Sequence, residues 1–313
     1  MGRAFVFPGQ GSQAVGMGRE LAEAFAPARH VFQEVDDALN QRLSRLMFEG
    51  PESDLTLTEN AQPALMAVSL AVVRVLQDEG GIALAERADF VAGHSLGEYS
   101  ALAAAGALDL ADAARLLKRR GQAMQAAVPV GEGAMAALLG LDLEVAREVA
   151  AAAAEGEVCD PANDNAPGQV VVSGHRAAVE RAIALAAEKG AKRAILLPVS
   201  APFHCALMAP AADAMAEALA AIVLQPPLIP LIANVTAEPV REPEAIRRLL
   251  VQQVTGLVRW RESVLAMKAA GVESLVELGA GKVLTGLARR IDRELAATAV
   301  GTPADVEALL KTL

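Results

Sequence analysis

Apolar residues occur in two kinds of segment along this chain. Some segments are short continuous runs, and others are longer stretches with helical spacing. The longer stretches include one from about 18 to 46, which is broken near Pro27. The short runs, which predict buried strands, lie at 4–7, 89–92, 231–234, 274–278 and 297–300. Strands that alternate with helices predict a parallel sheet covered by helices on both faces.

Polar residues at two points predict where helices begin. Asn60 is positioned to cap a long helix that has Pro63 in its first turn and ends at Gly80-Gly81. Asp109 is positioned to cap the next helix, with Asp112 completing an imperfect capping box.

The middle of the chain follows a different order of elements. The pattern predicts strand, helix, two strands, helix and strand, at 134–140, 142–155, 157–160, 169–173, 176–190 and 193–199. This β-α-β-β-α-β order is the ferredoxin-like split pattern. We therefore expect an α/β core formed by residues 1–130 and 199–313, with a small ferredoxin-like domain inserted at 131–198.

Composition narrows the classes of function. The length of 313 residues suits about two domains, and 53% hydrophobic residues suffice for a large core. The net charge of −10 and the 3% aromatic content argue against a nucleic-acid-binding protein. The two cysteines have no disulfide or zinc spacing, and we expect no targeting segment, membrane span or metal site. The simplest prediction is a cytoplasmic protein.

The segment Gly93-His94-Ser95-Leu96-Gly97 carries the clearest chemical signal. A G-x-S-x-G sequence between a predicted strand and a predicted helix is typical of a nucleophile elbow. Two glycines allow a sharp turn that exposes the Ser95 hydroxyl, and the Leu96 N–H lies at a helix N-terminus, where it can bind an oxyanion. The alternative is a tight turn with a capping serine.

A serine nucleophile needs a base, and the chain contains four histidines. His204 follows a predicted strand in a loop, where α/β proteins place their sites, so we favour it over a buried structural histidine. His30 and His175 are expected to be structural. We expect His94 to be a packed histidine pointing to the other side of the turn, although a catalytic base stays open there.

Two questions remain open from the residues alone. No Asp or Glu between Ser95 and His204 stands in a telling motif, so the partner that orients His204 is not identified. The run Lys118-Arg119-Arg120 is, by its spacing alone, a solvated helix face.

Several separated motifs together resemble malonyl-CoA:acyl-carrier-protein transacylases, the stand-alone enzymes of bacterial fatty acid synthesis, and related polyketide synthase acyltransferases. The main ones are Phe7-Pro8-Gly9-Gln10-Gly11-Ser12-Gln13, Gly93-His94-Ser95-Leu96-Gly97-Glu98 and Ala201-Pro202-Phe203-His204-Cys205. Weaker matches occur at Arg120-Gly121, 163–169, Asn234-Val235-Thr236, 253–260 and 277–284. The resemblance spans nearly the whole chain in order.

The resemblance implies a hydrolase-like core, a ferredoxin-like insert and an active site between them. It implies ping-pong transfer from malonyl-CoA through a malonyl-serine at Ser95, with His204 as base. The acceptor would be the phosphopantetheine thiol of acyl carrier protein, and no cofactor would be permanently bound. The backbone N–H groups of Leu96 and Gln10 would form the oxyanion hole, and the Gln253 carbonyl would orient His204.

The resemblance also implies residues that select the substrate. Arg120 would pair with the malonyl carboxylate, which suits a planar guanidinium. Phe203 would fill the space needed by an α-methyl group, which favours malonyl over methylmalonyl. His94, Asn163 and Asn165 would surround the site.

Acyl carrier proteins are acidic, and this chain is acidic too, so docking requires a local basic patch. Candidate residues are Lys189, Lys192, Arg193, Lys282, Arg289 and Arg290. The implied function is malonyl supply for fatty acid elongation; the alternatives are a trans-acting polyketide synthase acyltransferase, a serine hydrolase or thioesterase, and a non-catalytic module that docks carrier protein.

Overall fold

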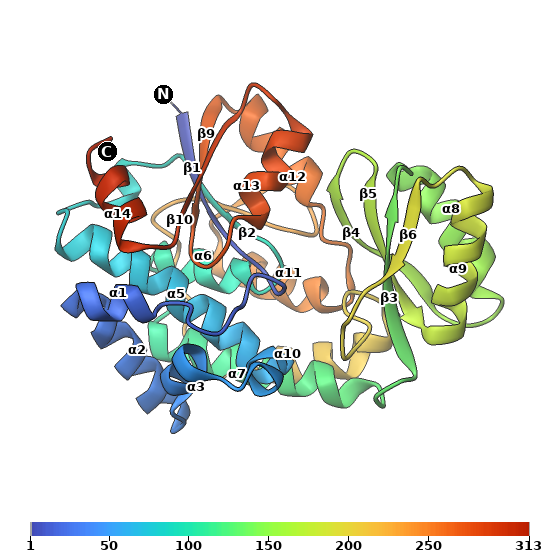
Figure 1. Ribbon diagram of the computed structural model, residues 1–313, viewed down its shortest axis with the longest axis horizontal. Helices are drawn as coiled ribbons and strands as arrows, with labels where there is room; N and C mark the ends of the chain where they lie inside the picture. The colour runs from blue at the N-terminus through green and yellow to red at the C-terminus, as the bar shows by residue number, and fades with distance from the viewer. Residues whose placement is uncertain (1, 313) are drawn as a thin grey trace.

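The larger of two sheets forms the centre of the molecule (Figure 1). The computed structural model describes residues 2–312. The larger sheet has the strand order β10-β9-β1-β2-β7-β8 and is parallel except for β8, which pairs antiparallel with β7. Its strands are β1 (Gly2–Phe7), β2 (Phe90–Gly93), β7 (Leu231–Ile232), β8 (Pro239–Val240), β9 (Val272–Leu278) and β10 (Ala296–Val300).

Successive side chains of β1 point to opposite faces of this sheet, and both faces are buried. Phe5 and Phe7 belong to the apolar cluster that includes the long helix α5 (Thr58–Asp78). Ala4 and Val6 belong to a second cluster with Trp260. A strand covered on both faces is a continuous apolar run, which is why 4–7 was recognisable.

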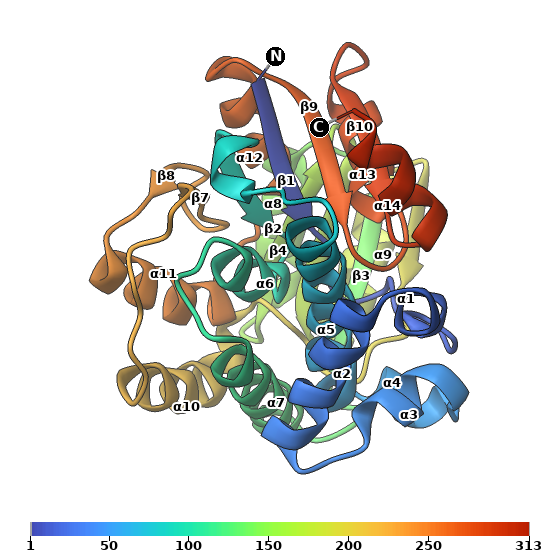
Figure 2. The same ribbon diagram turned by 90° about the vertical axis from the view of Figure 1, so that its left-hand side faces the viewer.

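Helices surround this sheet on its two sides (Figure 2). The N-terminal half contributes α1 (Arg19–Ala24), α2 (Ala26–Leu39), α3 (Leu43–Glu49), α4 (Glu52–Thr56), α5, η1 (Leu84–Glu86), α6 (Gly97–Ala104) and α7 (Leu110–Ala127). The C-terminal half contributes η2 (Ala206–Met208), α10 (Ala209–Ala220), α11 (Pro243–Thr255), α12 (Trp260–Ala269), α13 (Val283–Ile291) and α14 (Pro303–Leu310).

The second sheet is built from the middle of the chain. Its antiparallel strands are ordered β4-β5-β3-β6, and α8 (Leu143–Ala154) and α9 (Arg176–Glu188) cover its outer face (Figure 1). The strands are β3 (Gly133–Leu139), β4 (Cys159–Ala166), β5 (Gln169–His175) and β6 (Arg193–Leu196). This is the ferredoxin-like arrangement that the element order predicted, within the α/β class that was predicted for the whole chain.

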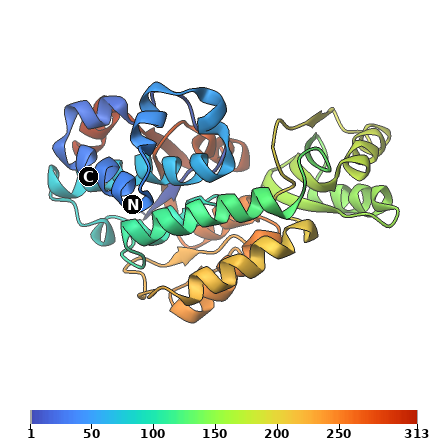
Figure 3. The ribbon, with the colours of Figure 1, turned by 90° about the horizontal axis from the view of Figure 1, so that it is seen from below.

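Successive side chains of β3 point to opposite faces of the small sheet and so contact both parts of the molecule. Ala134, Ala136 and Leu138 pack with α8 and α9, whereas Met135 packs with the larger cluster of the core. The long helix α7 runs across the core toward β3 (Figure 3). A strand bridge between Asn163 and Val258 ties β4 to the core a second time.

The structure corrects several expected element boundaries. The long helix begins at Thr58 after an N-cap at Leu57, so Asn60 lies inside its first turn and Pro63 lies further in. The Asn60 amide instead donates to the Asp54 carbonyl. Asp109 is the N-cap of α7 but makes no side-chain capping bond. Asp109 thus occupies the predicted cap position with extended backbone, whereas Asn60 does not.

Two segments differ in extent from what the apolar periodicity of the sequence predicts. The stretch from 18 to 46 divides into α1, α2 and α3, with Pro27 in the first turn of α2 and Asn40 in a left-handed conformation after it. Strand β4 extends to Ala166, six residues beyond its predicted end, because its polar residues pair with β5. Within residues 2–312 no helix is long and apolar enough to span a membrane.

Candidate active site

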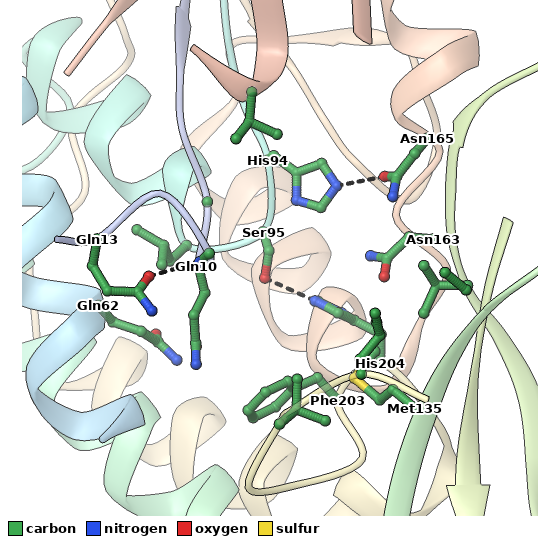
Figure 4. Close-up of a pocket in the computed structure, with 18 of the residues that line it drawn as sticks. Gln10, Gln13, Gln62, His94, Ser95, Met135, Asn163, Asn165, Phe203 and His204 are labelled. Atoms are coloured by element: carbon green, nitrogen blue, oxygen red, sulfur yellow. Dashed lines mark hydrogen bonds between the residues drawn. The ribbon is translucent and has the colours of Figure 1, made fainter. Parts of the chain in front are cut away.

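A cavity of about 640 Å³ lies where the inner face of the small sheet meets the carboxyl ends of the core strands (Figure 4). The core contributes Ser95, Arg120 and His204 to its wall, and the small sheet contributes Met135 and Asn163. Sites at the carboxyl ends of parallel strands are general in α/β proteins.

The turn between β2 and α6 adopts the geometry of a nucleophile elbow. Ser95 has φ 54°, in the left-handed region, which a non-glycine residue adopts only when its surroundings enforce it. A Cβ on Gly93 would lie 1.9 Å from the Gly97 carbonyl carbon, and a Cβ on Gly97 would lie 2.3 Å from the Phe7 carbonyl oxygen. Both glycines are therefore required for the turn to pack against β1.

Ser95, His204 and Gln253 form a chain of hydrogen bonds. His204 Nδ1 lies 2.8 Å from the Gln253 carbonyl oxygen, which can only accept, so Nδ1 carries the proton. His204 Nε2 is then an acceptor for the Ser95 hydroxyl, 2.7 Å away. Burial and the Arg120 charge lower the pKa of His204 to about 3, so the ring is held neutral. The geometry is that of a hydroxyl beside its base (Figure 4).

Two backbone N–H groups beside Ser95 remain available. The amides of Gln10 and Leu96 make no hydrogen bond within the described part of the chain, and both residues line the cavity. Leu96 is the N-cap residue of α6, where backbone N–H groups are unsatisfied by the helix itself. Two free donors next to a nucleophile are what an oxyanion hole requires.

Arg120 is buried at the floor of this cavity, with 1% of its surface exposed. Its Nη1 donates to Gln62 Oε1 at 2.8 Å, and its Nη2 donates to Gln253 Oε1 at 2.9 Å and Ser95 Oγ at 3.1 Å. Its Nε has no partner in the structure. The site therefore contains a buried guanidinium with a donor to spare.

This position corrects the interpretation of residues 118–120 that rested on spacing alone. Arg119 is exposed, but Lys118 is half-buried and pairs with Glu59 at 2.8 Å, and Arg120 faces the opposite side of α7. Residues two apart on a helix lie on different faces, so a run of three cations cannot be exposed throughout on a packed helix.

The other residues expected near the site line the same cavity. His94 Nε2 lies 2.8 Å from Asn165 Oδ1, and the imidazole packs 5.8 Å from the Trp260 ring. His94 therefore is packed and hydrogen-bonded, but its ring borders the cavity instead of pointing away from it (Figure 4). Asn163 and Phe203 also line the wall. Among the described residues, His94 makes no hydrogen bond to Ser95.

Four polar groups of the site were not singled out for a role from the sequence. Asn234 accepts from the Ser95 N–H at 2.8 Å and donates to the Gly93 carbonyl at 2.7 Å, which fixes the elbow from outside. The others are Gln62, Glu98 and the side chain of Gln253. No local signal distinguishes Gln62 or Glu98, because each lies among other polar residues in the first turns of its helix.

Glu98 is a fully buried carboxyl beneath the elbow. Its Oε1 accepts from the Asn234 N–H at 3.0 Å, and its Oε2 accepts from Gln253 Nε2. Burial raises the pKa of Glu98 to about 8, although these hydrogen bonds and the Arg120 charge oppose the shift. Within residues 2–312 no three His, Cys, Asp or Glu side chains gather into a group fit to hold a metal ion.

The candidate basic residues occupy two separate places. Lys282 is the N-cap residue of α13, and Arg290 near the end of that helix donates to Gln169 Oε1 at 2.9 Å. Val283 and Gln169 line the cavity, so these cations lie near its mouth. Lys189 follows α9 on the outer side of the insert and pairs with Glu148 at 3.3 Å. Lys192, Arg193 and Arg289 are exposed.

A family model, the acyl transferase domain, matches residues 4–302, and its match includes every residue of the cavity described above. The chain belongs to the acyl transferase family. Among similar curated proteins, the malonyl CoA-acyl carrier protein transacylase of Escherichia coli (strain K12) is 50% identical over 308 residues, 98% of each chain.

Solved structures of other acyl transferases share the fold throughout. The acyl-carrier-protein-S-malonyltransferase of Bartonella henselae has a TM-score of 0.97 at 59% identity and covers 100% of this chain and 99% of its own. A type II polyketide synthase acyl-carrier protein in complex with its malonyl-transacylase gives a TM-score of 0.96 at 46% identity, with 100% of both chains covered. The two-domain acyl transferase fold is thus shared across the whole length.

Proposed function

We propose that this acyl transferase moves a malonyl group from malonyl-CoA to the phosphopantetheine thiol of acyl carrier protein, with Ser95 as the covalent carrier. The observation that carries the proposal is the position of Ser95 Oγ, between His204 Nε2 at 2.7 Å and Arg120 Nη2 at 3.1 Å. We take residues 1–130 and 199–313 as the core that holds these groups and 131–198 as the insert that closes the cavity.

In the first half-reaction, Ser95 Oγ attacks the thioester carbon of malonyl-CoA. The hydroxyl proton passes to His204 Nε2, and the Gln253 carbonyl holds the resulting imidazolium through Nδ1–H. The N–H groups of Gln10 and Leu96 stabilise the oxyanion. The C–S bond then breaks, the coenzyme A thiolate takes the proton from His204, and malonyl-Ser95 remains.

The second half-reaction reverses these steps with a different thiol. His204 accepts the proton of the carrier's phosphopantetheine thiol, and the thiolate attacks the ester carbon of malonyl-Ser95. The second oxyanion occupies the same two N–H groups. Collapse breaks the bond to Ser95 Oγ, which recovers its proton from His204. No permanently bound cofactor takes part in either step.

Arg120 distinguishes malonyl from acetyl in this proposal. An isolated carboxylate in a buried cavity is costly unless it is paired, and the Arg120 guanidinium is the cation there. A planar guanidinium binds a carboxylate in a fork, which a lysine cannot reproduce. We also propose that the Phe203 ring, which lies in the cavity wall, excludes an α-methyl substituent.

For carrier docking, we favour the cations of α13 over those of the insert. Lys282 and Arg290 are exposed beside the mouth of the cavity, and an acidic carrier would meet them as its arm enters. Fatty acid synthesis is the process we propose. A polyketide carrier is the second candidate, because the similar malonyl-transacylase described above is in complex with one.

Intact-mass measurement after mixing with malonyl-CoA tests the proposal. Wild-type protein should gain one malonyl group, and Ser95→Ala should gain none while keeping its fold, since only one hydroxyl is removed. The adduct should persist until a pantetheine thiol is added, because the enzyme transfers to thiols and not to water. Rapid loss of the adduct in buffer alone would indicate a thioesterase, and an adduct on Ser95→Ala would contradict the assignment.

A further inference from the structure

We propose that Glu98 and the side chain of Gln253 act as one positioning unit that holds Arg120 in place and makes the site selective for acyl groups bearing a carboxylate. The inference rests on the proposed function and adds two residues to it. Neither side chain touches the cavity in the way Ser95 or Arg120 does: Glu98 and Gln253 are both buried and absent from the cavity wall.

Gln253 contacts several parts of the site through its side chain and its backbone. Its Oε1 accepts from Arg120 Nη2 at 2.9 Å, and its Nε2 donates to the Ser95 carbonyl at 2.9 Å and toward Asn234 Oδ1 at 3.2 Å. The backbone carbonyl of the same residue holds His204. One residue on α11 therefore links the base, the elbow and the guanidinium.

The Ser95 carbonyl and Glu98 together decide which end of the Gln253 amide faces Arg120. An amide has a donor end and an acceptor end, and its neighbours determine which way it points. The Ser95 carbonyl can only accept, so it requires Nε2 on its side, and Glu98 Oε2 accepts from the same nitrogen. The acceptor Oε1 is then left facing Arg120. A buried carboxyl thus supports the orientation of the Gln253 amide without touching the guanidinium.

The cradle fixes the plane of the guanidinium at two separate atoms. Gln62 holds Nη1 and Gln253 holds Nη2, on opposite sides of the same rigid group. A guanidinium fixed in this way meets a substrate carboxylate in a predetermined orientation, which increases binding by pre-organisation. Loss of one acceptor should therefore weaken the binding of malonyl more than that of acetyl.

Gln253→Met separates this role from the support of His204. Methionine retains the length of the side chain and the backbone carbonyl, but removes both ends of the amide. Because a hydrogen bond to a charged group is worth about a factor of 10 to 100, kcat/KM for malonyl-CoA should fall by that range, mainly through KM. Acylation from acetyl-CoA should change only a few-fold. Gln252→Met, at the exposed neighbour on α11, is the matched control and should leave both unchanged.

Glu98→Gln tests the polarity argument directly, because it changes neither Gln253 nor Arg120. The variant places an amide NH₂ against either Gln253 Nε2 or the Asn234 N–H, both of which are donors. Gln253 Oε1 is then held less firmly against Arg120, so we expect the malonyl-to-acetyl ratio to fall by about 10-fold. Ser100→Ala is a control on α6, since that buried hydroxyl has no partner in the structure.

These measurements distinguish the inference from the proposed function. If wild-type protein forms no malonyl adduct, the proposed function fails. If wild type is loaded but Gln253→Met reduces malonyl and acetyl transfer equally, the inference alone is wrong. Should Gln253→Met not fold by circular dichroism, Glu98→Gln decides: a folded variant that keeps the wild-type malonyl-to-acetyl ratio overturns the inference.

Discussion

The nucleophile elbow and the Arg120 cradle lie side by side, but they are held in place by different parts of the chain. The elbow takes its shape from Gly93 and Gly97, each within two residues of Ser95. The Arg120 guanidinium is held by Gln62 and Gln253, which are 58 and 133 residues away. The turn that exposes the nucleophile is thus encoded locally, whereas its base, 109 residues away, and the choice of acyl group depend on tertiary contacts.

This difference predicts that the two regions fail differently when they are altered. Damage to the Ser95–His204 pair should reduce transfer of every acyl group, because each one passes through the same ester. Damage to the cradle should change which acyl group is transferred. The malonyl-to-acetyl ratio therefore separates the two regions experimentally.

The largest effect is expected for His204→Ala. Loss of the base of a serine nucleophile typically costs about 10³-fold or more, so acylation by malonyl-CoA and acetyl-CoA should fall together by that factor. His94→Ala should cost less, because His94 binds Asn165 and packs on Trp260 without contacting Ser95. Rapid-quench measurement of the acyl-enzyme gives both rates. A folded His94→Ala variant that acylates more slowly than His204→Ala would reverse the two assignments.

Arg120→Ala is expected to have the next largest effect, and it should be selective. Truncation of one partner of a buried charge pair costs about 2–5 kcal/mol, so kcat/KM for malonyl-CoA should fall by roughly 30-fold to several thousand-fold. Acetyl-CoA has no carboxylate and should lose little. Because Arg120 also contacts Ser95 Oγ, the acetyl rate reports any effect on the nucleophile itself.

Arg120→Lys is the matched variant for the same site. It retains the charge but cannot supply two parallel donors, so it should recover only part of the malonyl activity. Steady-state kcat/KM with both thioesters checks this series. If Arg120→Ala lowers malonyl and acetyl transfer by the same factor, Arg120 does not bind the carboxylate and the comparison between the two regions fails.

A smaller effect is expected at the mouth of the cavity. Reversal of the exposed charges with Lys282→Glu and Arg290→Glu should raise KM for carrier protein several-fold and leave KM for malonyl-CoA nearly unchanged, with the difference shrinking as salt increases. Lys189→Glu, on the outer side of the insert, is the control. Equal changes in KM for the two substrates would argue against docking at α13.

The smallest effect concerns pH. His204 must be neutral to act as base, and burial and the Arg120 charge lower its pKa to about 3. The neutral form is lost only as pH falls through that value, so the malonylation rate should change less than about two-fold between pH 6 and 8. Arg120→Ala removes one of the two causes that lower the pKa of His204. The malonylation rate of this variant should therefore begin to fall at a higher pH than that of the wild type. A wild-type inflection near 6.5 would show that the ring is not held neutral.

Local sequence determined much of this protein. The strand-like runs, the ferredoxin-like order of the middle section and the position of Ser95 in a glycine-flanked turn all follow from rules that span a few residues. The acyl transferase family and its α/β fold were recognisable from motifs that occur in order along the chain. Chain turns and strand periodicity are short-range properties, so one stretch of sequence is sufficient to predict them.

The tertiary structure decided the rest. Asn60 does not cap the long helix, which begins at Thr58, and Asp109 occupies the N-cap position of α7 without a side-chain capping bond. The spacing of the run 118–120 predicts that Arg120 is exposed. In the structure its side chain is buried and donates to Gln62 and Gln253. Burial of a charge depends on which distant groups surround it. The local sequence therefore sets the nucleophile, and the folded chain alone creates the cradle beside it.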